Sequence, residues 1–212
     1  GKNISSLAVS GDYFDIIEVG DGRPLWIVIA DVCGKGTPAA LLMATIHGTL
    51  HSHVRRGIND PVQVAIVLHG HIRELIKHDR NEDQEEAASK NGAEAEKGTD
   101  VEEEAKTEKK RDQDGEKKLD SAYATAFLAT LNPATGQLHY VNAGHVRPLH
   151  VTSDGTVSQL QSGGYPLGLL DEVKAFKDEI VTLRPNDVLC LCTDGVTEAR
   201  YRNNEFESSR LQ

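Results

Sequence analysis

Long apolar runs, cysteines and an excess of basic residues are scarce or missing in this sequence of 212 residues. No apolar run approaches the roughly 20 residues of a membrane-spanning helix, so we expect no membrane span in this segment. Three cysteines are too few for a secreted disulfide framework, and the polar start does not resemble a secretory leader, so we expect a cytoplasmic location. Lys and Arg number 23 against 33 Asp and Glu, and the net charge of −10 argues against nucleic acid as a partner.

One long segment, residues 81–118, lacks the residues that build a hydrophobic core. It contains no Leu, Ile, Phe or Met, and its acidic residues outnumber its basic ones. Such a composition cannot bury enough apolar surface to offset the entropy lost when the backbone is ordered. We therefore interpret residues 81–118 as an acidic, low-complexity, disordered insertion within a single domain that spans residues 1–212.

The chain before this insertion predicts one strand followed by two helices. Residues 25–30 form an apolar run rich in β-branched residues, which is typical of a strand covered on both faces. A helix is expected over residues 37–57, because Thr-Pro can begin it and an apolar residue recurs at every fourth position. The Asp-Pro pair at residues 60–61 predicts the start of a second helix, which we expect to end at about His78.

Beyond residue 118 the apolar runs are typical of strands. Two antiparallel hairpins are expected, one with strands at 123–131 and 138–143 and the other with strands at 146–152 and 156–160, since proline, aspartate and glycine occupy the turns. Residues 187–192 repeat the pattern of a strand buried on both faces. Hairpins grouped apart from helices predict an α+β fold with antiparallel sheets in layers.

Aspartates occupy the ends of two of these buried strands and a third short segment. Asp31 and Asp194 follow apolar strands, while Asp12 and Asp15 lie in the third segment, where an extended backbone would point them to opposite faces. A carboxylate at the edge of a dry sheet needs hydrogen bonds or a cation, and its oxygens suit Mg²⁺ or Mn²⁺. The alternative, that each aspartate caps a turn or a helix, remains open on spacing alone.

Five motifs follow one another along the chain: SGDYFD at 10–15, ADVCGKGTPAA at 30–40, VNAGH at 141–145, PLG at 166–168 and CTDGVTEA at 192–199. In this order and combination they resemble the metal-dependent PPM protein phosphatases, above all the SpoIIE-like and RsbU-like bacterial serine phosphatases. The resemblance implies a sandwich of two antiparallel β-sheets flanked by helix pairs, in agreement with the α+β prediction.

The resemblance also implies a centre of two Mn²⁺ or Mg²⁺ ions. By position in the motifs, Asp31 would bridge both ions. Asp12 would bind one ion with the backbone carbonyl of Val32, Asp194 would bind the other, and Asp15 is a weaker candidate. A hydroxide held between the ions would hydrolyse phosphoserine or phosphothreonine on a regulatory protein without a covalent phosphoenzyme.

The resembled branch works in signal transduction and in the bacterial stress response through sigma-factor regulation. The expected partner is therefore a phosphorylated protein such as an anti-sigma-factor antagonist, and an N-terminal sensor or regulatory domain is expected in a longer chain. The family usually continues past the point that matches residues 206–211, with a strand whose Asp-Asp pair completes the Asp194 ion site. We therefore expect truncation at both ends.

Two other functions remain open besides an active phosphatase. One is a catalytically impaired regulatory or binding domain of the same shape, which lacks the C-terminal metal carboxylates. The other is a different metal phosphoesterase that acts on small molecules or nucleic acid. The net negative charge of the chain disfavours nucleic acid as the substrate.

Several histidines and cysteines outside these aspartates have ordinary structural interpretations. His47 and His51 lie one helical turn apart and could bind Zn²⁺, but no third ligand is evident, so we interpret them as surface histidines. Cys190 and Cys192 are expected to be small buried apolar residues. His145, with Arg147 nearby, could face a phosphate or could instead stabilise its own loop.

Overall fold

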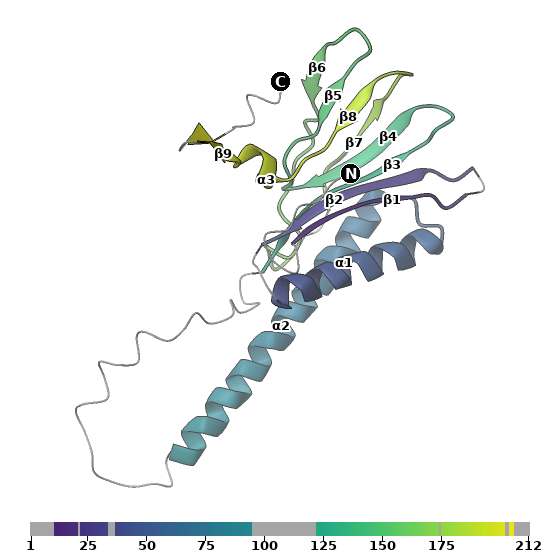
Figure 1. Ribbon diagram of the computed structural model, residues 1–212. Coiled ribbons are helices and arrows are strands. Elements are labelled where there is room, and N and C mark those ends of the chain that lie inside the picture. Colours follow the sequence, from purple (N-terminus) through teal and green to yellow (C-terminus); the bar gives the residue numbers. More distant parts are fainter. Residues whose placement is uncertain are drawn as a thin grey trace.

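The computed structural model describes residues 11–20, 22–33, 37–94, 122–173, 175–201 and 204–205. Its elements form three layers: a pair of helices, a five-stranded sheet and a three-stranded sheet (Figure 1). The helix layer consists of α1 (Thr37–Arg55) and α2 (Pro61–Glu94). This arrangement confirms the predicted α+β fold with layered antiparallel sheets, although α1 and α2 are the one long helix pair in the described part of the chain.

Both larger sheets are antiparallel throughout. The five-stranded sheet has the order β1-β2-β3-β4-β7 and contains β1 (Asp12–Ile17), β2 (Leu25–Val32), β3 (Ala124–Leu131), β4 (Gln137–Ala143) and β7 (Asp178–Thr182). The three-stranded sheet has the order β6-β5-β8 and contains β5 (Leu149–Val151), β6 (Val157–Gln159) and β8 (Val188–Cys190). After β8 come the short helix α3 (Asp194–Thr197) and the two-residue strands β9 (Arg200–Tyr201) and β10 (Asn204–Glu205), which pair with each other.

The central strand β2 is covered on both faces, as its continuous apolar pattern predicts. Trp26, Val28 and Ala30 point toward the helices, where they pack in one core with the buried stripe of α1. Ile29 lies on the other face, in a second core with residues of β3, β4 and the segment around β8. Alternate side chains of one strand thus serve two cores, which fixes the order of the three layers.

The starts of both helices and the core-facing side of α1 follow the sequence pattern. The predicted stripe of α1 is fully buried and comprises Leu42, Ile46, Leu50 and Val54. The Asp60 side chain accepts a hydrogen bond from the backbone N–H of Val62 at 2.9 Å, which caps the start of α2.

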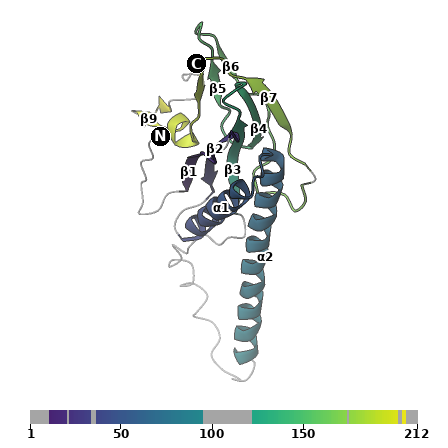
Figure 2. The ribbon, with the colours of Figure 1, turned by 90° about the vertical axis from the view of Figure 1, so that its right-hand side faces the viewer.

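Helix α2 extends farther than the sequence analysis predicts. It continues past His78 to Glu94 and projects away from the sheets (Figure 2). Residues 81–94 are rich in alanine and glutamate, which have high helix propensity, so the helix persists where no core is available. The prediction that disorder begins at residue 81 therefore does not hold for 81–94, and residues 95–118 lie outside the described part of the chain.

Among the described helices, none is long and apolar enough to cross a membrane.

Both predicted hairpins are present, as β3 with β4 and as β5 with β6. The expectation of a doubly buried strand at 187–192 is wrong. Strand β8 is short, and Val188 and Cys190 are exposed while Cys192 is only half-buried. Leu189 and Leu191 still pack inward against the second core. Only this inner face is covered in the described part of the chain, because no helix pair lies over the outer face of the three-stranded sheet (Figure 1).

Asn142 fixes the turn that follows β4. Its side chain is buried, and its amide group donates to the backbone carbonyl of His145 at 3.1 Å while its oxygen accepts from the His145 N–H at 2.7 Å. Gly144 lies between them with φ of 70°, and a side chain there would collide with Pro166. The VNAGH motif is therefore a structural clamp that holds the β4 loop against the segment containing Pro166.

We expect Asn142→Ala to destabilise the protein by about 2–4 kcal/mol, because both backbone groups of His145 would lose their partner in a buried position. Urea denaturation of the variant and of the wild type measures this difference. Asn132→Ala is the matched control, since Asn132 makes a single exposed side-chain bond to the Ala134 N–H and its loss should cost under about 1 kcal/mol. Equal losses in the two variants would contradict the assignment of Asn142 as a clamp.

Candidate metal centre

The pairing of β1 with β2 brings Asp12 and Asp31 together. In this antiparallel register Asp12 lies directly opposite Asp31, so the two side chains share one face of the sheet. The chain just before Asp12 is also held close to β2, because the Val32 N–H donates to the Gly11 carbonyl at 3.1 Å. A Cβ atom on Gly11 would lie 2.9 Å from the Val32 carbonyl oxygen, so a glycine is required for this approach.

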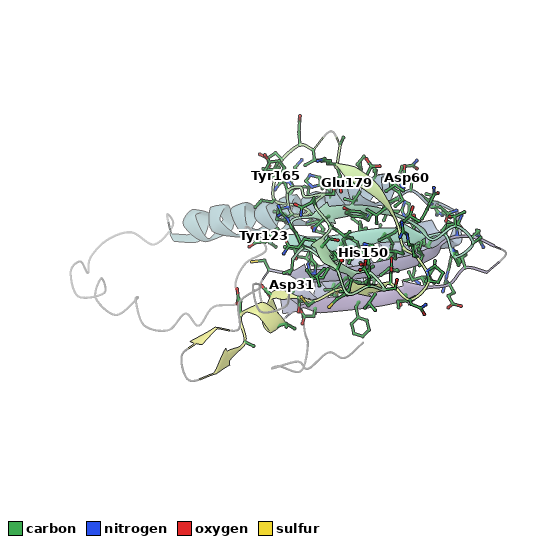
Figure 3. The ribbon with its side chains drawn as sticks, turned by 90° about the horizontal axis from the view of Figure 1, so that it is seen from above. Asp31, Asp60, Tyr123, His150, Tyr165 and Glu179 are labelled. Carbon is green, nitrogen blue, oxygen red and sulfur yellow. The ribbon has the colours of Figure 1, made fainter. Side chains whose placement is uncertain are left out.

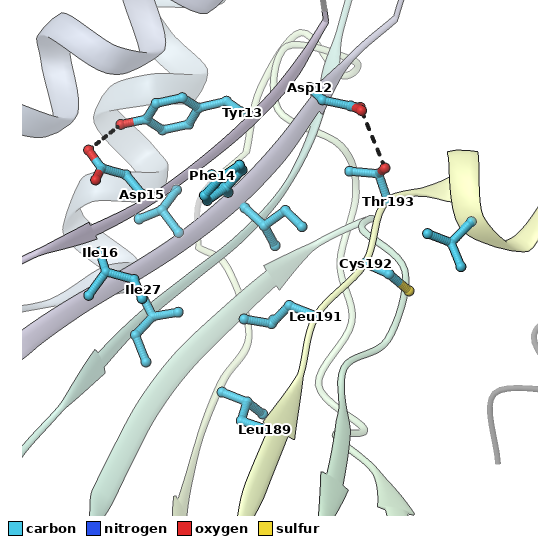
Figure 4. A pocket seen from close by; sticks show the side chains of 13 residues that line it. Asp12, Tyr13, Phe14, Asp15, Ile16, Ile27, Leu189, Leu191, Cys192 and Thr193 are labelled. Carbon is cyan, nitrogen blue, oxygen red and sulfur yellow. Dashed lines mark hydrogen bonds between the residues drawn. The ribbon is translucent and has the colours of Figure 1, made fainter. Parts of the chain in front are cut away.

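Asp194 reaches the same end of the molecule from the far end of the sequence. It is the first residue of α3, which follows β8. The preceding residue, Thr193, donates from its hydroxyl to the Asp12 carboxylate at 3.5 Å, a long hydrogen bond that joins the two segments (Figure 4). The charge of Asp194 also acts on Asp31. The structure thus gathers Asp12, Asp31 and Asp194, whose role as metal ligands stays a prediction.

Electrostatic repulsion is concentrated on Asp31. Burial of its carboxyl, together with the negative charges of Asp194 and Asp12, raises the pKa of Asp31 to about 7. A hydrogen bond with Asp12 and the charge of Glu198, at the end of α3, act in the same direction. Grouped carboxylates of this kind are stabilised by divalent cations, and their hard oxygen atoms match Mg²⁺ or Mn²⁺. The donor set therefore fits the ions that the sequence motifs imply.

Asp15 does not join this group. Because β1 is extended, the Asp15 side chain lies on the opposite face, against α1. Its oxygen lies 2.8 Å from His51 Nε2 and accepts a hydrogen bond from the Tyr13 hydroxyl at 3.0 Å, the second of which is drawn in Figure 4. Burial of Asp15 opposes its ionisation, but these hydrogen bonds outweigh burial and hold its pKa below the usual range. Burial and the adjacent Asp15 raise the pKa of Tyr13, which remains protonated.

His145 connects the loop after β4 with β3 and with the segment that contains Cys192 and Asp194. It is buried, and its Nδ1 lies 2.9 Å from the hydroxyl of Thr125, the residue paired with Asp31 across β2 and β3. Burial lowers the pKa of His145 to about 4, although the Cys192 backbone and the Asp194 charge favour its protonation. A neutral, buried imidazole supports the loop-stabilising interpretation, and the exposed position of Arg147 gives no support to a role in this cluster.

Tyr123 and Thr125 are neighbours of the cluster that sequence analysis did not identify. A hydrogen bond with Cys33 raises the pKa of Tyr123, and the charges of Asp31 and Asp194 contribute to that rise. Figure 3 shows Asp31 and Tyr123 at the same end of the molecule. Neither residue belongs to a polar motif. The register of β2 against β3 places Thr125 opposite Asp31, and the hydrogen bond from the Cys33 N–H to the Tyr123 carbonyl at 2.9 Å extends this pairing to Tyr123.

An apolar groove runs from the carboxylates along the face of β1. It is lined mainly by apolar residues of β1, β2 and the segment around β8, with Asp12 and Thr193 at one end (Figure 4). Phe14 and Ile16 on this face are exposed, unlike the side chains of β2 that face the helices. The candidate centre is thus a group of carboxylates at the edge of the sheet, next to the apolar groove.

Two curated proteins are similar in sequence to almost the whole chain. The chain is 30% identical over 200 residues to protein IcfG of Synechocystis, covering 94% of this chain and 28% of that protein. It is 27% identical over 211 residues to phosphoserine phosphatase RsbU of Bacillus subtilis, covering 99% of this chain and 49% of that protein. The chain therefore spans about half or less of the length of these relatives.

Solved structures have the same architecture. The RsbU and RsbW domains of a Mycobacterium tuberculosis protein match with a TM-score of 0.63 at 24% identity, over 98% of this chain and 45% of that one. RsbX in complex with magnesium matches with a TM-score of 0.54 at 14% identity, over 88% of this chain and 67% of that one. The family model described as Stage II sporulation protein E (SpoIIE) matches residues 21–212. Since that match spans most of the sequence and the structure has the corresponding fold, the chain belongs to the SpoIIE family.

Proposed function

We propose that this domain is a metal-dependent protein serine/threonine phosphatase. The observation that carries the proposal is the convergence of Asp12, Asp31 and Asp194 at one edge, with the pKa of Asp31 raised to about 7. Membership of the SpoIIE family and the similarity to phosphoserine phosphatase RsbU support the same activity.

We infer that the three carboxylates together coordinate two Mn²⁺ or Mg²⁺ ions. Asp31, which lies opposite Asp12 and feels the charge of Asp194, would hold both ions, Asp12 and the Val32 carbonyl would hold one of them, and Asp194 would hold the other. When bound, such ions lower the pKa of water so that it can attack phosphorus, and they offset charge on the phosphoryl oxygens. The Thr193 hydroxyl orients the Asp12 carboxylate, and neutral His145 is hydrogen-bonded to Thr125, the residue opposite Asp31 on the next strand.

The proposed substrate is a phosphoserine or phosphothreonine on a regulatory protein. The name of the RsbU relative specifies phosphoserine, and one structural neighbour combines RsbU and RsbW domains in a single protein. By extension, we propose a phosphorylated anti-sigma-factor antagonist as the partner class. The cytoplasmic location and the N-terminal sensor domain stay predictions.

Replacing Asp31 or Asp194 by Asn should reduce Mn²⁺-dependent hydrolysis of a phosphoserine peptide by more than about 100-fold, because each loss removes a proposed ion ligand. Asp178→Asn is the control, since Asp178 lies on β7 and pairs with His139 instead. Steady-state kinetics with Mn²⁺, run beside calorimetric titration with Mn²⁺, measure both effects. Full activity in either variant would refute the centre, and Mn²⁺ binding by the wild type without turnover would indicate a regulatory domain.

The raised pKa of Asp31 predicts a pH-dependent stability difference in metal-free protein. Folding raises this pKa from 3.8 to about 7, so the folded chain keeps a proton that the unfolded chain releases. Stability is therefore lost as the pH rises from about 4 to about 7, and the cost is constant above that window and absent below it.

Asp31→Asn removes this cost, so in a chelator at pH 8 the variant should melt about 2–4 °C higher than the wild type. This corresponds to a cost on the order of 1 kcal/mol after allowance for solvent screening. The difference should vanish near pH 4, and saturating Mn²⁺ should reverse it by stabilising the wild type alone. Thermal melts at the two pH values check this, and a variant that melts lower at pH 8 would contradict the repulsion on Asp31.

A further inference from the structure

A second cluster of ligand-type side chains lies on the other face of β1, between that strand and α1. One possible ligand atom each from Asp15, His47 and His51 lies within 4.8 Å of the other two. His47 and His51 are one helical turn apart, which places both imidazoles on the same side of α1. The third ligand that the sequence alone does not reveal is therefore Asp15, supplied by the neighbouring strand.

Short contacts already hold these groups together. His51 Nε2 lies 2.8 Å from the Asp15 carboxylate, and the two imidazole ring centroids are 4.2 Å apart. The Tyr13 hydroxyl donates to Asp15 at 3.0 Å and lies 3.1 Å from His47 Nδ1. Because the tyrosine hydrogen goes to Asp15, His47 Nδ1 is the donor in the second contact, and its Nε2 keeps a lone pair.

The arrangement matches the requirements of a zinc site. Zn²⁺ takes imidazole nitrogens at about 2.0 Å and carboxylate oxygens at about 2.0–2.2 Å, and tetrahedral ligands are therefore roughly 3.3 Å apart. Atoms now within 4.8 Å can reach that spacing through side-chain shifts of about 1 Å. A histidine ligand whose other nitrogen donates to a neighbour, as His47 does to Tyr13, is held in a fixed tautomer and orientation.

Solvent can reach the cluster from one side. His47 is exposed, and the side chains of His51 and Asp15 are 25% and 29% exposed. An open hollow beside the two histidines is lined by α1 and the residue after it, namely His47, Gly48, His51, Ser52, Arg55 and Arg56. An ion could enter here, and a water or an anion could complete its coordination.

We propose that Asp15, His47 and His51 form a zinc site that is separate from the acidic centre. The two sites differ in chemistry, because two imidazoles favour Zn²⁺ while an all-oxygen donor set favours Mg²⁺ or Mn²⁺. Bound zinc would fasten β1 to α1 at the edge of the five-stranded sheet. Asp12 lies three residues before Asp15 on that strand. By restricting the motion of β1, bound zinc would therefore also restrict the position of the Asp12 carboxylate in the acidic centre.

The test uses the full chain with Asp12→Asn and Asp31→Asn, stripped of metal, so that the acidic centre cannot contribute. Zn²⁺ is titrated in competition with a chromophoric chelator, and Co²⁺ serves as a spectroscopic probe whose visible bands report nitrogen ligands and low coordination number. One equivalent of Zn²⁺ should bind and raise the melting temperature. Absence of a Zn²⁺-dependent shift and of a Co²⁺ spectrum would overturn the proposal, whatever the outcome of the phosphatase assays.

Three further substitutions in this background, His51→Gln, His47→Gln and Asp15→Asn, identify the ligands. Each should weaken Zn²⁺ binding at least about 10–100-fold and change the Co²⁺ spectrum. His139→Gln is the matched control, because His139 pairs with Asp178 at 2.6 Å without a second histidine in that pair, and it should bind Zn²⁺ normally. Unchanged Zn²⁺ binding in the three ligand variants would show an ordinary hydrogen-bonded cluster. Circular dichroism of the metal-free variants verifies folding. Zn²⁺ binding by any one folded variant is enough to show whether the substituted side chain is a ligand.

Discussion

Two like-charged carboxylates face each other across the β1–β2 pair, and the rest of the candidate centre depends on this register. A shift of one residue would move Asp12 to the helix face and leave Asp31 opposite a neutral residue. The side chains of β1 that face the helices oppose such a shift, because Tyr13 and Ile17 pack against the helix-facing core and would be moved to the other face. Hydrophobic burial thus holds two charges in a position that electrostatics alone disfavours.

The same strand alternation creates two different chemical environments on the faces of β1. Asp12 points toward the α3 segment, where its neighbours are the Thr193 hydroxyl and the Asp31 carboxylate, and all of these groups offer oxygen atoms. Tyr13 and Asp15 point toward α1, where the neighbours are imidazoles. One edge strand can therefore contribute to two sites of different metal preference without either site sharing a ligand.

Sequence patterns predicted the helix starts, helix faces and hairpins that depend on residues close together in the chain. The start of α2 at Asp60-Pro61, the buried stripe of α1 and the β3–β4 hairpin depend on residues close in sequence, and all three are present. The burial of Cys190 was predicted wrongly, because burial depends on whether another layer covers the strand. The end of α2 was missed because helix propensity continued beyond the last apolar residue.

The candidate centre was predictable only in part. Motif order identified Asp12, Asp31 and Asp194, but the neighbours Thr125 and Tyr123 depend on how β3 pairs with β2. The third group beside His47 and His51 depends on how β1 packs on α1, so no spacing within the helix could reveal Asp15. Contacts between elements that are distant in sequence account for each of these omissions.

The most direct measurement is a crystal structure of the full chain grown with Mn²⁺, with anomalous diffraction used to locate the ions. Anomalous peaks are expected within coordination distance of the Asp31 carboxylate, with Asp12 and the Val32 carbonyl on one side and Asp194 on the other. Anomalous peaks elsewhere, or an Asp31 carboxylate with no ion beside it at saturating Mn²⁺, would contradict the proposed centre.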